Sequence, residues 1–530
     1  MATGANLRWL RTVAFASGLV VLGVEVTAFR IVAPYFGSSI FTTTNLLGVI
    51  LAALALGYWL GGRVADKQPD VRRSSTRLYQ VLVAAAIVVA ALPSLAPALL
   101  GWLRGMIVGL DWSLILVSLG GSALLFFVPF AVLGMVSPWL VRLATREVAA
   151  AGRTAGSLFA WSTLGSLLGT FVPTLLLVPL IGTKRTILLL AALLALVGAV
   201  GLVRRRWFVP AALLVALVPV TQPAYFAHDA SVVAEREGAT EYLRVLQDGR
   251  RTVLEQDEGF GVHSVYDPTT VVTGMVFDWF SLAPALRQVP ASAGAPGRSL
   301  NVGIVGLAAG TVAREYGAFF GPHGTDPHDL ALSGVELDPE TLTLARRYFG
   351  FDAIEPPVKA TAGDGRVWLT EQRQFDVLVV DAFRQLYIPP HLSSQEFFQL
   401  AAQHLAPGGV VVVNLNVVGA STLVEQKLAG TLRSVFPSVL SVHVPGSYNV
   451  LLFAAQHPLD PTTVAARTHV PELRSTAASF TQRAVPVQPV SDPWLIATDD
   501  RPLVESLYDA MVARAVFVQP GSIDATQPGR

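Results

Sequence analysis

The chain contains no cysteine and few charged residues. Only 14% of its 530 residues are Asp, Glu, Lys or Arg, well below the about 25% that is usual in soluble proteins. The absence of cysteine excludes disulfide bonds, thiolate zinc sites and cysteine nucleophiles. Hydrophobic residues make up 52% of the chain. This composition favours a protein with a large membrane-embedded part and at least one further domain.

Acidic residues are scarce in the first half of the chain. Residues 1–228 carry 17 Lys or Arg and 5 Asp or Glu, a net charge of +12, whereas the remainder carries 21 and 32, a net charge of −11. The basic half is also the apolar half, as expected of segments held against anionic lipid. The acidic half lacks the positive charge that a phosphate backbone requires. We therefore expect a lipid bilayer, and no nucleic acid, among the partners.

Apolar runs of about 20 residues or more, long enough to cross a bilayer, recur through the first half. The first is too long for a cleaved signal peptide, and more such runs follow it. A shorter run at 207–224 contains three prolines. The sequence thus predicts a polytopic transmembrane domain of six to seven spans over residues 1–228. The six longer runs lie at residues 9–33, 44–62, 78–99, 113–134, 156–181 and 184–203.

Lys and Arg residues cluster on alternate connections between these runs, at residues 8–11, 63–77, 142–153 and 204–206. Positive charge is retained on the cytoplasmic side of a membrane. Six spans therefore predict a multi-pass protein of the cell membrane with its N-terminus and its second half in the cytoplasm. A seventh span at 207–224 would place the second half outside, so an interfacial or re-entrant run is expected there.

The character of the chain changes near residue 228. Residues 241–268 alternate apolar and polar side chains between glycine-containing breaks, which is typical of a small antiparallel sheet, and we assign this β module to residues 229–290. From residue 291 to 510, strand-like runs alternate with helical ones, which predicts an α/β domain with a mostly parallel sheet. Residues 511–530 are expected to form a flexible tail.

The second half carries small residues and acids where its predicted strands end. Residues 300–317 read as a strand, a turn with Gly306 and Gly310, and a helix start, so that backbone can approach a ligand closely. Glu336 and Asp338 end the next strand, at a spacing that suits the two hydroxyls of a ribose.

Two further strand ends continue this pattern. Asp364 and Gly365 lie in a predicted loop, where a carboxylate could accept from an adenine amino group, and Asp381 ends the buried run 375–383. Any one of these acids could be a helix cap or a surface residue. Four such features in order, each at the carboxyl end of a strand, predict a nucleotide site.

The stretch from about 237 to 505 resembles the polyamine aminopropyltransferases, the spermidine synthase family. With the multi-span half and TDDRPLVE (498–505), the chain is similar to a membrane-fused branch of that family. The other segments that carry the resemblance are EYLRV (241–245), DEGFGVHSVY (257–266), VGLAAGTVARE (305–315), VELDP (335–339), GDGRVW (363–368), VVDAF (379–383), HLSSQEFF (391–398) and LAPGG (405–409).

The resemblance implies a small β module followed by a Rossmann-like domain of the methyltransferase type. It implies S-adenosylmethionine or its decarboxylated form as the donor, a small-molecule amine or other acceptor, and no metal. It leaves the oligomeric state open, a homodimer included. The family's adenosyl-binding acids correspond to Glu336, Asp364 and Asp338, beside Gly306, Gly310 and Gly365.

Two positions depart from the family pattern. Ala309 stands where the family has an Asp that binds the amine of the decarboxylated donor. Arg384 stands where the second Asp of the family's Asp-Ser-Ser-Asp-Pro segment acts as the base. A cation repels an approaching polyamine and cannot act as a general base, but it could hold a carboxylate in a bidentate fork. Arg384 is therefore placed among the residues that bind the donor, and it favours intact S-adenosylmethionine.

Three residues are candidates for the chemical step. Asp381 is retained at its strand tip, His263 matches the family's Tyr-His-Glu segment, and Tyr387 lies in the loop expected to cover the acceptor. Three hypotheses stay open. The first is alkyl-chain transfer of the aminopropyl type to an amine. The second is methyl transfer or another cleavage of S-adenosylmethionine, and the third is a non-catalytic nucleotide sensor coupled to a membrane carrier.

Overall fold

The computed structural model divides the chain into two compact units, residues 1–229 and 230–530, which are described one at a time. This division falls one residue after the predicted end of the transmembrane domain. The run at 207–224 and the tail at 511–530 lie outside the described residues. Those residues are 7–36, 40–68, 70–110, 114–145, 150–202, 231–238, 241–256, 262–288, 299–372, 374–382, 389–417, 423–490 and 492–501.

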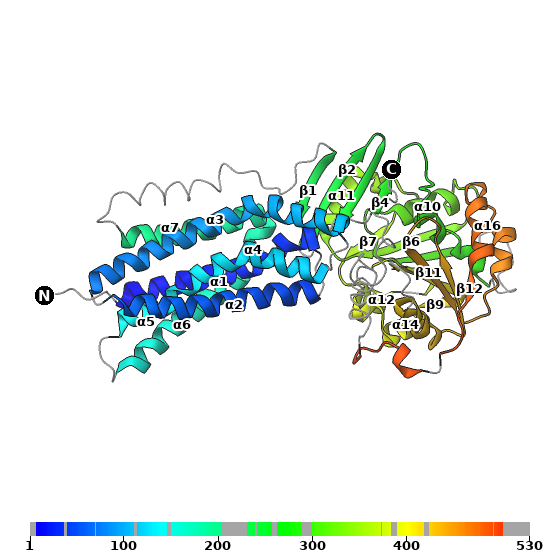
Figure 1. The fold of residues 1–530 in the computed structure, drawn as a ribbon. Coiled ribbons are helices and arrows are strands. Elements are labelled where there is room, and N and C mark those ends of the chain that lie inside the picture. Colours follow the sequence, from blue (N-terminus) through cyan, green and yellow to red (C-terminus); the bar gives the residue numbers. More distant parts are fainter. Residues whose placement is uncertain are drawn as a thin grey trace. The chain divides into compact units, whose positions relative to one another are not determined.

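The first unit is built of long apolar helices (Figure 1). Within its described part, six are long and apolar enough to cross a membrane. This agrees in number with the six longer predicted runs and confirms the multi-span helical class, although the predicted run 156–181 extends into the helix that begins at Val178. The helices are α1 (Leu7–Phe36), α2 (Ile40–Asp66), α3 (Val71–Leu110), α4 (Leu114–Gly134), α5 (Val136–Ala144), α6 (Ala151–Val172) and α7 (Val178–Gly201), with a π-helical turn at Pro173–Leu177.

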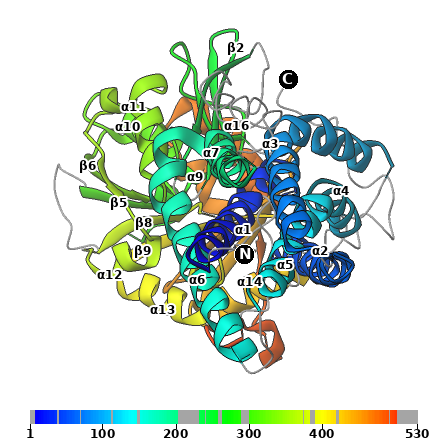
Figure 2. The same ribbon diagram turned by 90° about the vertical axis from the view of Figure 1, so that its left-hand side faces the viewer.

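Helix α1 lies in the middle of this bundle and contacts α2 to α7 (Figure 2). Small residues allow the closest approach, between α1 and α6. A Cβ atom added at Gly165 would lie 1.9 Å from the carbonyl oxygen of Phe15, and one at Gly169 would lie 2.2 Å from that of Leu19. Helices pack this closely in a bilayer where side chains are small. Large apolar side chains such as Leu175 and Leu180, each 71% exposed, point outward, as a lipid-facing surface requires.

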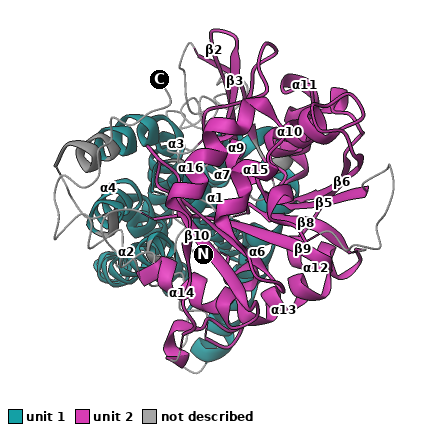
Figure 3. Cartoon of the chain, turned by 90° about the vertical axis from the view of Figure 1, so that its right-hand side faces the viewer, with its two compact units in different colours: residues 1–229 teal, residues 230–530 magenta. Residues whose placement is uncertain are grey.

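The second unit contains two sheets (Figure 3). The first is an antiparallel sheet of four strands in the order β1-β2-β3-β4, which confirms the predicted β module. Its first strand begins before the patterned stretch at 241–268. The strands are β1 (Val232–Glu237), β2 (Tyr242–Asp248), β3 (Arg251–Gln256) and β4 (Val262–Tyr266), and the short helix α9 (Phe277–Phe280) follows them.

The larger sheet has eight strands in the order β12-β10-β11-β9-β8-β5-β6-β7. Strands β5 to β9 run parallel, while β11 is antiparallel to both of its neighbours. This arrangement confirms the predicted Rossmann-like, methyltransferase-type class. The strands are β5 (Ser299–Val305), β6 (Asp329–Glu336), β7 (Lys359–Ala362), β8 (Phe375–Val380), β9 (Leu405–Asn416), β10 (Ser438–His443), β11 (Asn449–Ala455) and β12 (Val485–Pro486).

Both faces of this sheet are buried. Along β8, Val377 and Val379 join one hydrophobic core, whereas Leu378 and Val380 join the other. Successive side chains of a strand point to opposite faces, so a continuous apolar run is what a sheet covered on both sides requires. The covering helices are α10 (Thr311–Phe320), α11 (Pro339–Tyr348), α12 (Gly365–Thr370), α13 (Gln395–Gln403), α14 (Leu423–Arg433), α15 (Val464–Arg467) and α16 (Arg474–Arg483).

The strand order reverses at β5. The chain proceeds from β5 through β6 to β7 on one side, and then crosses to β8 and β9 on the other. In open α/β sheets, ligands bind outside the carboxyl ends of the strands at such a reversal. A ligand site is therefore expected at the carboxyl ends of β5, β6 and β8.

Candidate functional site

The turn after β5 is fixed by contacts with both neighbouring strands. The amides of Gly306 and Leu307 each donate a 3.0 Å hydrogen bond to the carbonyl of Val335 on β6. Gly306 has φ +88°, and a Cβ atom there would lie 2.2 Å from the carbonyl oxygen of Asp381. Gly310 has φ +89° and directly precedes α10 as its N-cap. Both glycines are thus required by the fold, and their contact with a ligand stays a prediction.

Glu336 joins this turn to the end of β6. Its Oε2 accepts a 2.9 Å hydrogen bond from the Ala308 amide, and its Oε1 accepts one of 3.2 Å from the Asp338 amide. The side chain is buried, and this burial raises its pKa although the two amides act against it. Each carboxylate oxygen has a second lone pair, so Glu336 is still equipped to accept from ligand hydroxyls.

Asp338 is fully buried and has a structural task. It is the N-cap of α11, where its Oδ1 accepts a 3.0 Å hydrogen bond from the Glu340 amide. The sequence Asp-Pro-Glu, with proline as the first residue of the helix, is a typical helix start. The predicted contact of Asp338 with a ribose is an addition to this task and stays a prediction.

Asp364 lies in the predicted loop as the N-cap of helix α12, whereas Gly365 is the first residue of that helix, so the predicted loop ends one residue too late. Asp364 Oδ1 accepts hydrogen bonds of 2.9 Å and 3.0 Å from the amides of Arg366 and Val367, because an Asp at this position satisfies the open amides of a helix start. Its Oδ2 contacts His391 Nε2 at 2.8 Å. Burial acts to raise the pKa of Asp364, but the amide of Val367, His391 and the amide of Arg366 together lower it.

Asp381 directly follows β8, at the reversal of the sheet. Its amide donates a 2.8 Å hydrogen bond to the carbonyl of Val305, and its Oδ1 accepts one of 2.9 Å from Asn414 Nδ2 on the neighbouring strand β9. Burial raises the pKa of Asp381 to about 6, although the Asn414 hydrogen bond lowers it. A carboxyl group with this pKa is ionised near neutral pH and is a stronger base than an ordinary aspartate.

The β module contacts the turn after β5 through β4. The Ala309 amide donates a 2.9 Å hydrogen bond to Ser264 Oγ, and the Val265 amide donates one of 2.8 Å to Thr311 Oγ1. His263, half-buried on β4, adjoins this contact. Its catalytic role stays a prediction. Arg384 and Tyr387 lie outside the described residues.

Sequence reasoning missed four residues of this region. Asn414 lies two residues before the end of the apolar strand β9, and a polar side chain at that position is a signal that could have found it. The other three are His391, which contacts Asp364, and the pair Arg366 and Asp499. These side-chain contacts form only in the folded chain, and no local sequence pattern predicts them.

Part of the second unit matches a known domain family. Residues 330–454 match the spermine/spermidine synthase domain. These residues run from β6 to β11 and include Glu336, Asp364 and Asp381. The predicted resemblance to the spermidine synthase family is therefore confirmed for this part of the chain.

Individual relatives extend the match. The chain is 34% identical over 240 residues, 44% of its length, to a probable polyamine aminopropyl transferase of Bifidobacterium longum, and it covers 49% of that relative. It is 26% identical over 476 residues to the polyamine aminopropyltransferase of Mycobacterium tuberculosis, with 84% of each chain covered. A solved structure of a probable spermidine synthase from Corynebacterium glutamicum is 20% identical, with a TM-score of 0.37, and the similarity covers 49% of this chain and 99% of that one.

Proposed function

We propose that this protein is a membrane-anchored transferase that moves an alkyl chain of the aminopropyl type from an adenosyl sulfonium donor to an amine. The donor is decarboxylated S-adenosylmethionine or S-adenosylmethionine. The observation that carries the proposal is Asp381, an acid with a raised pKa at the point where the sheet reverses. The names of the two polyamine aminopropyltransferase relatives support it.

Three carboxylates have separate roles in this proposal, two in binding the donor and one in the chemical step. Glu336 accepts from the ribose hydroxyls, because its oxygens retain lone pairs beside two main-chain amides. Asp364 accepts from the adenine amino group through Oδ2, the oxygen that its helix-capping bonds do not use and that has a second lone pair beside its contact with His391. Asp381 follows β8, on the opposite side of β5 from β6 and β7, whose carboxyl ends carry the other two acids. In this proposal it faces the reacting atoms.

The donor supplies a carbon atom made electrophilic by the adjacent sulfonium. The amine nitrogen forms a bond to this carbon with its lone pair, while the carbon–sulfur bond breaks and its electrons return to sulfur. Methylthioadenosine leaves, and the nitrogen releases one proton. Asp381 accepts that proton, since a base with a pKa of about 6 is ionised at neutral pH.

The location of the protein belongs to the same proposal. Within its described part, the first unit has six helices long and apolar enough to cross a bilayer. Most of its Lys and Arg residues fall on alternate connections, and only Arg104, Lys184 and Arg185 fall on the others. We place the protein in the cell membrane with residues 230–530 in the cytoplasm, where adenosyl donors are available.

Methyl transfer from intact S-adenosylmethionine is the second candidate. It is favoured by Ala309, whose buried side chain stands where the family pattern has the Asp that binds the amine of the decarboxylated donor. The missing carboxylate removes one reason to prefer that donor. A nucleotide sensor without catalysis is the third possibility.

The released nucleoside distinguishes these three. The full chain, in detergent or in a lipid nanodisc, is incubated with each donor and a set of primary amines. Methylthioadenosine is the expected product, and its formation should depend on the amine. S-adenosylhomocysteine in its place would show methyl transfer. Donor binding without either product would overturn the enzyme and support the sensor.

A further inference from the structure

The segment 492–501 lies against two helices of the large sheet's cover. The Gln395 amide at the start of α13 donates a 2.8 Å hydrogen bond to the Ala497 carbonyl, and Lys427 Nζ on α14 donates one of the same length to the Trp494 carbonyl. The Ala497 amide donates to Thr431 Oγ1, also at 2.8 Å. These bonds hold the segment in place without using its acidic side chains.

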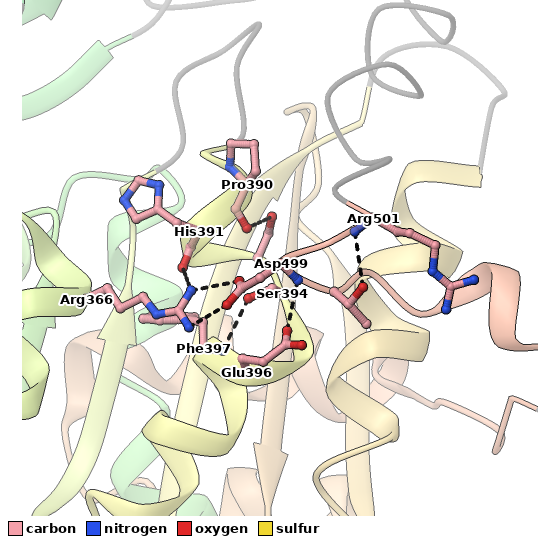
Figure 4. A network of polar contacts seen from close by, with 10 residues as sticks. Arg366, Pro390, His391, Ser394, Glu396, Phe397, Asp499 and Arg501 are labelled. Atoms are coloured by element: carbon pink, nitrogen blue, oxygen red, sulfur yellow. Dashed lines mark hydrogen bonds and ion pairs between the residues drawn. The ribbon is translucent and has the colours of Figure 1, made fainter.

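Asp499 in this segment forms a two-pronged ion pair with Arg366 (Figure 4). The Nη1 and Nη2 atoms of Arg366 each donate a 2.8 Å hydrogen bond to one oxygen of the Asp499 carboxylate. The Asp499 amide donates one of 3.0 Å to Glu396 Oε2. Two parallel hydrogen bonds join the planar guanidinium to the carboxylate, and the Asp499 main chain is itself bonded to Glu396. The pair therefore fixes the orientation of the Arg366 guanidinium as well as its position.

Arg366 is also bound to both partners of the Asp364–His391 contact. Its main-chain amide donates a 2.9 Å hydrogen bond to Asp364 Oδ1, and its Nη1 donates one of 3.2 Å to the His391 carbonyl. Asp364 Oδ2 and His391 Nε2 meet at 2.8 Å. A single side chain therefore fixes the main chain at residues 364–366 relative to that at residue 391.

We propose that Asp499 and Arg366 are positioning residues that hold Asp364 and His391 in the geometry that recognises the adenine edge of the donor. The inference rests on the proposed function, because Asp364 is assigned to the adenine amino group there. It adds that residues 492–501, which lie 128 to 137 positions after Asp364 in the chain, complete the adenosyl site without touching the ligand.

The ion pair is suited to this task and poorly suited to stabilising the fold. The Arg366 and Asp499 side chains are 27% and 41% exposed, and ion pairs this exposed contribute little to the free energy of unfolding. Loss of the Asp499 charge would remove the bonds that orient the Arg366 guanidinium. The loss should therefore appear in ligand affinity and not in thermal stability.

The test uses Asp499→Asn with Asp500→Asn as the matched control. Asp500 is the neighbouring residue of the same turn, and within the described part of the chain its exposed side chain has no hydrogen-bond or ion-pair partner. Affinity for methylthioadenosine and for S-adenosylmethionine is measured by calorimetry on the full chain, beside the melting temperature. We expect about tenfold weaker binding for Asp499→Asn and parent-like binding for Asp500→Asn.

A double-mutant cycle shows whether Asp499 acts through Asp364. Asp364→Asn keeps an oxygen for the helix cap but replaces the oxygen that faces His391 with a donor. If Asp499 positions that oxygen, its substitution should cost little further affinity once Asp364→Asn is present. Fully additive losses, or parent-like affinity of Asp499→Asn, would overturn the inference while leaving the proposed function intact. Failure of the parent protein to bind either nucleoside would instead overturn the proposed function.

Discussion

Asn414 Nδ2 and Asp381 Oδ1 are joined by a 2.9 Å hydrogen bond across the carboxyl ends of two neighbouring parallel strands. The bond opposes the effect of burial, which raises the pKa of Asp381 to about 6. Asn414 thereby influences the pH range in which Asp381 is a carboxylate. It is also the only direct partner of that carboxylate among the described residues.

Removal of this donor should shift the pH dependence of catalysis. In Asn414→Ala the carboxylate loses a hydrogen bond to its charged form, so the pKa of Asp381 should rise. The acid limb of the pH–rate profile should then move to higher pH than in the parent protein. An unmoved limb in a variant that still binds the donor would remove Asp381 from the proton transfer.

Loss of the carboxylate itself should remove most of the activity. Asp381→Asn retains the size of the side chain and an acceptor for Asn414, but it cannot take a proton from the amine. We expect turnover to fall by about 10² to 10⁴, with donor affinity within a few fold of the parent. Rate measurements at saturating donor and amine decide this, and parent-like turnover would contradict the role of base.

The same substitution should increase stability near neutral pH. A pKa of about 6 in the folded protein exceeds the ordinary value of 3.8, so the folded state binds more protons than the unfolded state between these two values. Stability therefore falls as the pH rises through this window. Asp381→Asn should melt higher than the parent at about pH 7.5, and this difference should shrink at about pH 4. A difference independent of pH would argue against the raised pKa.

Glu336→Gln should weaken the binding of adenosyl ligands. We expect a loss of at least about tenfold, or roughly 1.4 kcal/mol, because the charge-assisted bonds to the ribose are lost. Glutamine can also accept only one of the two amides that Glu336 binds, so the melting temperature must be followed in parallel. Unchanged affinity by calorimetry in a folded variant would exclude Glu336 from the site.

A reporter fused after Arg530 tests the sidedness of the membrane. With an even number of spans and a cytoplasmic N-terminus, a reporter that works only in the cytoplasm should be active. A reporter that works only outside the cytoplasm should be silent. The opposite pattern would make the run at 207–224 a true seventh span.

Much of the fold could be predicted because it depends on local patterns. Apolar runs of about 20 residues or more form membrane spans or buried helices. All six of the longer predicted runs are helical in the structure. Ligands bind at the carboxyl ends of parallel strands, and Glu336 and Asp381 lie at such ends on the two sides of β5. Both inferences use only the order of residues along the chain.

The rest depends on contacts between distant segments. The sequence predicts ligand-binding roles for Asp338 and Asp364. The main-chain bonds of each are those of a helix cap, because an acid at a strand end suits both tasks. The ion pair between Arg366 and Asp499 joins residues 133 positions apart. Arg384, which favours intact S-adenosylmethionine as the donor, and Tyr387, in the loop expected to cover the acceptor, lie outside the described residues.

Because Gly306 has no side chain, the turn after β5 can pack directly against the end of β8, and this limits which substitutions the site tolerates. The turn after β5 and the tip of β8 approach so closely at this point that a Cβ atom would meet the Asp381 carbonyl at 2.2 Å. A larger residue would displace Asp381 together with the turn, so the backbone of neither can move alone. If the turn binds a donor as proposed, a change of donor preference is expected to come from its side chains, such as the buried Ala309, while the main-chain frame stays constant.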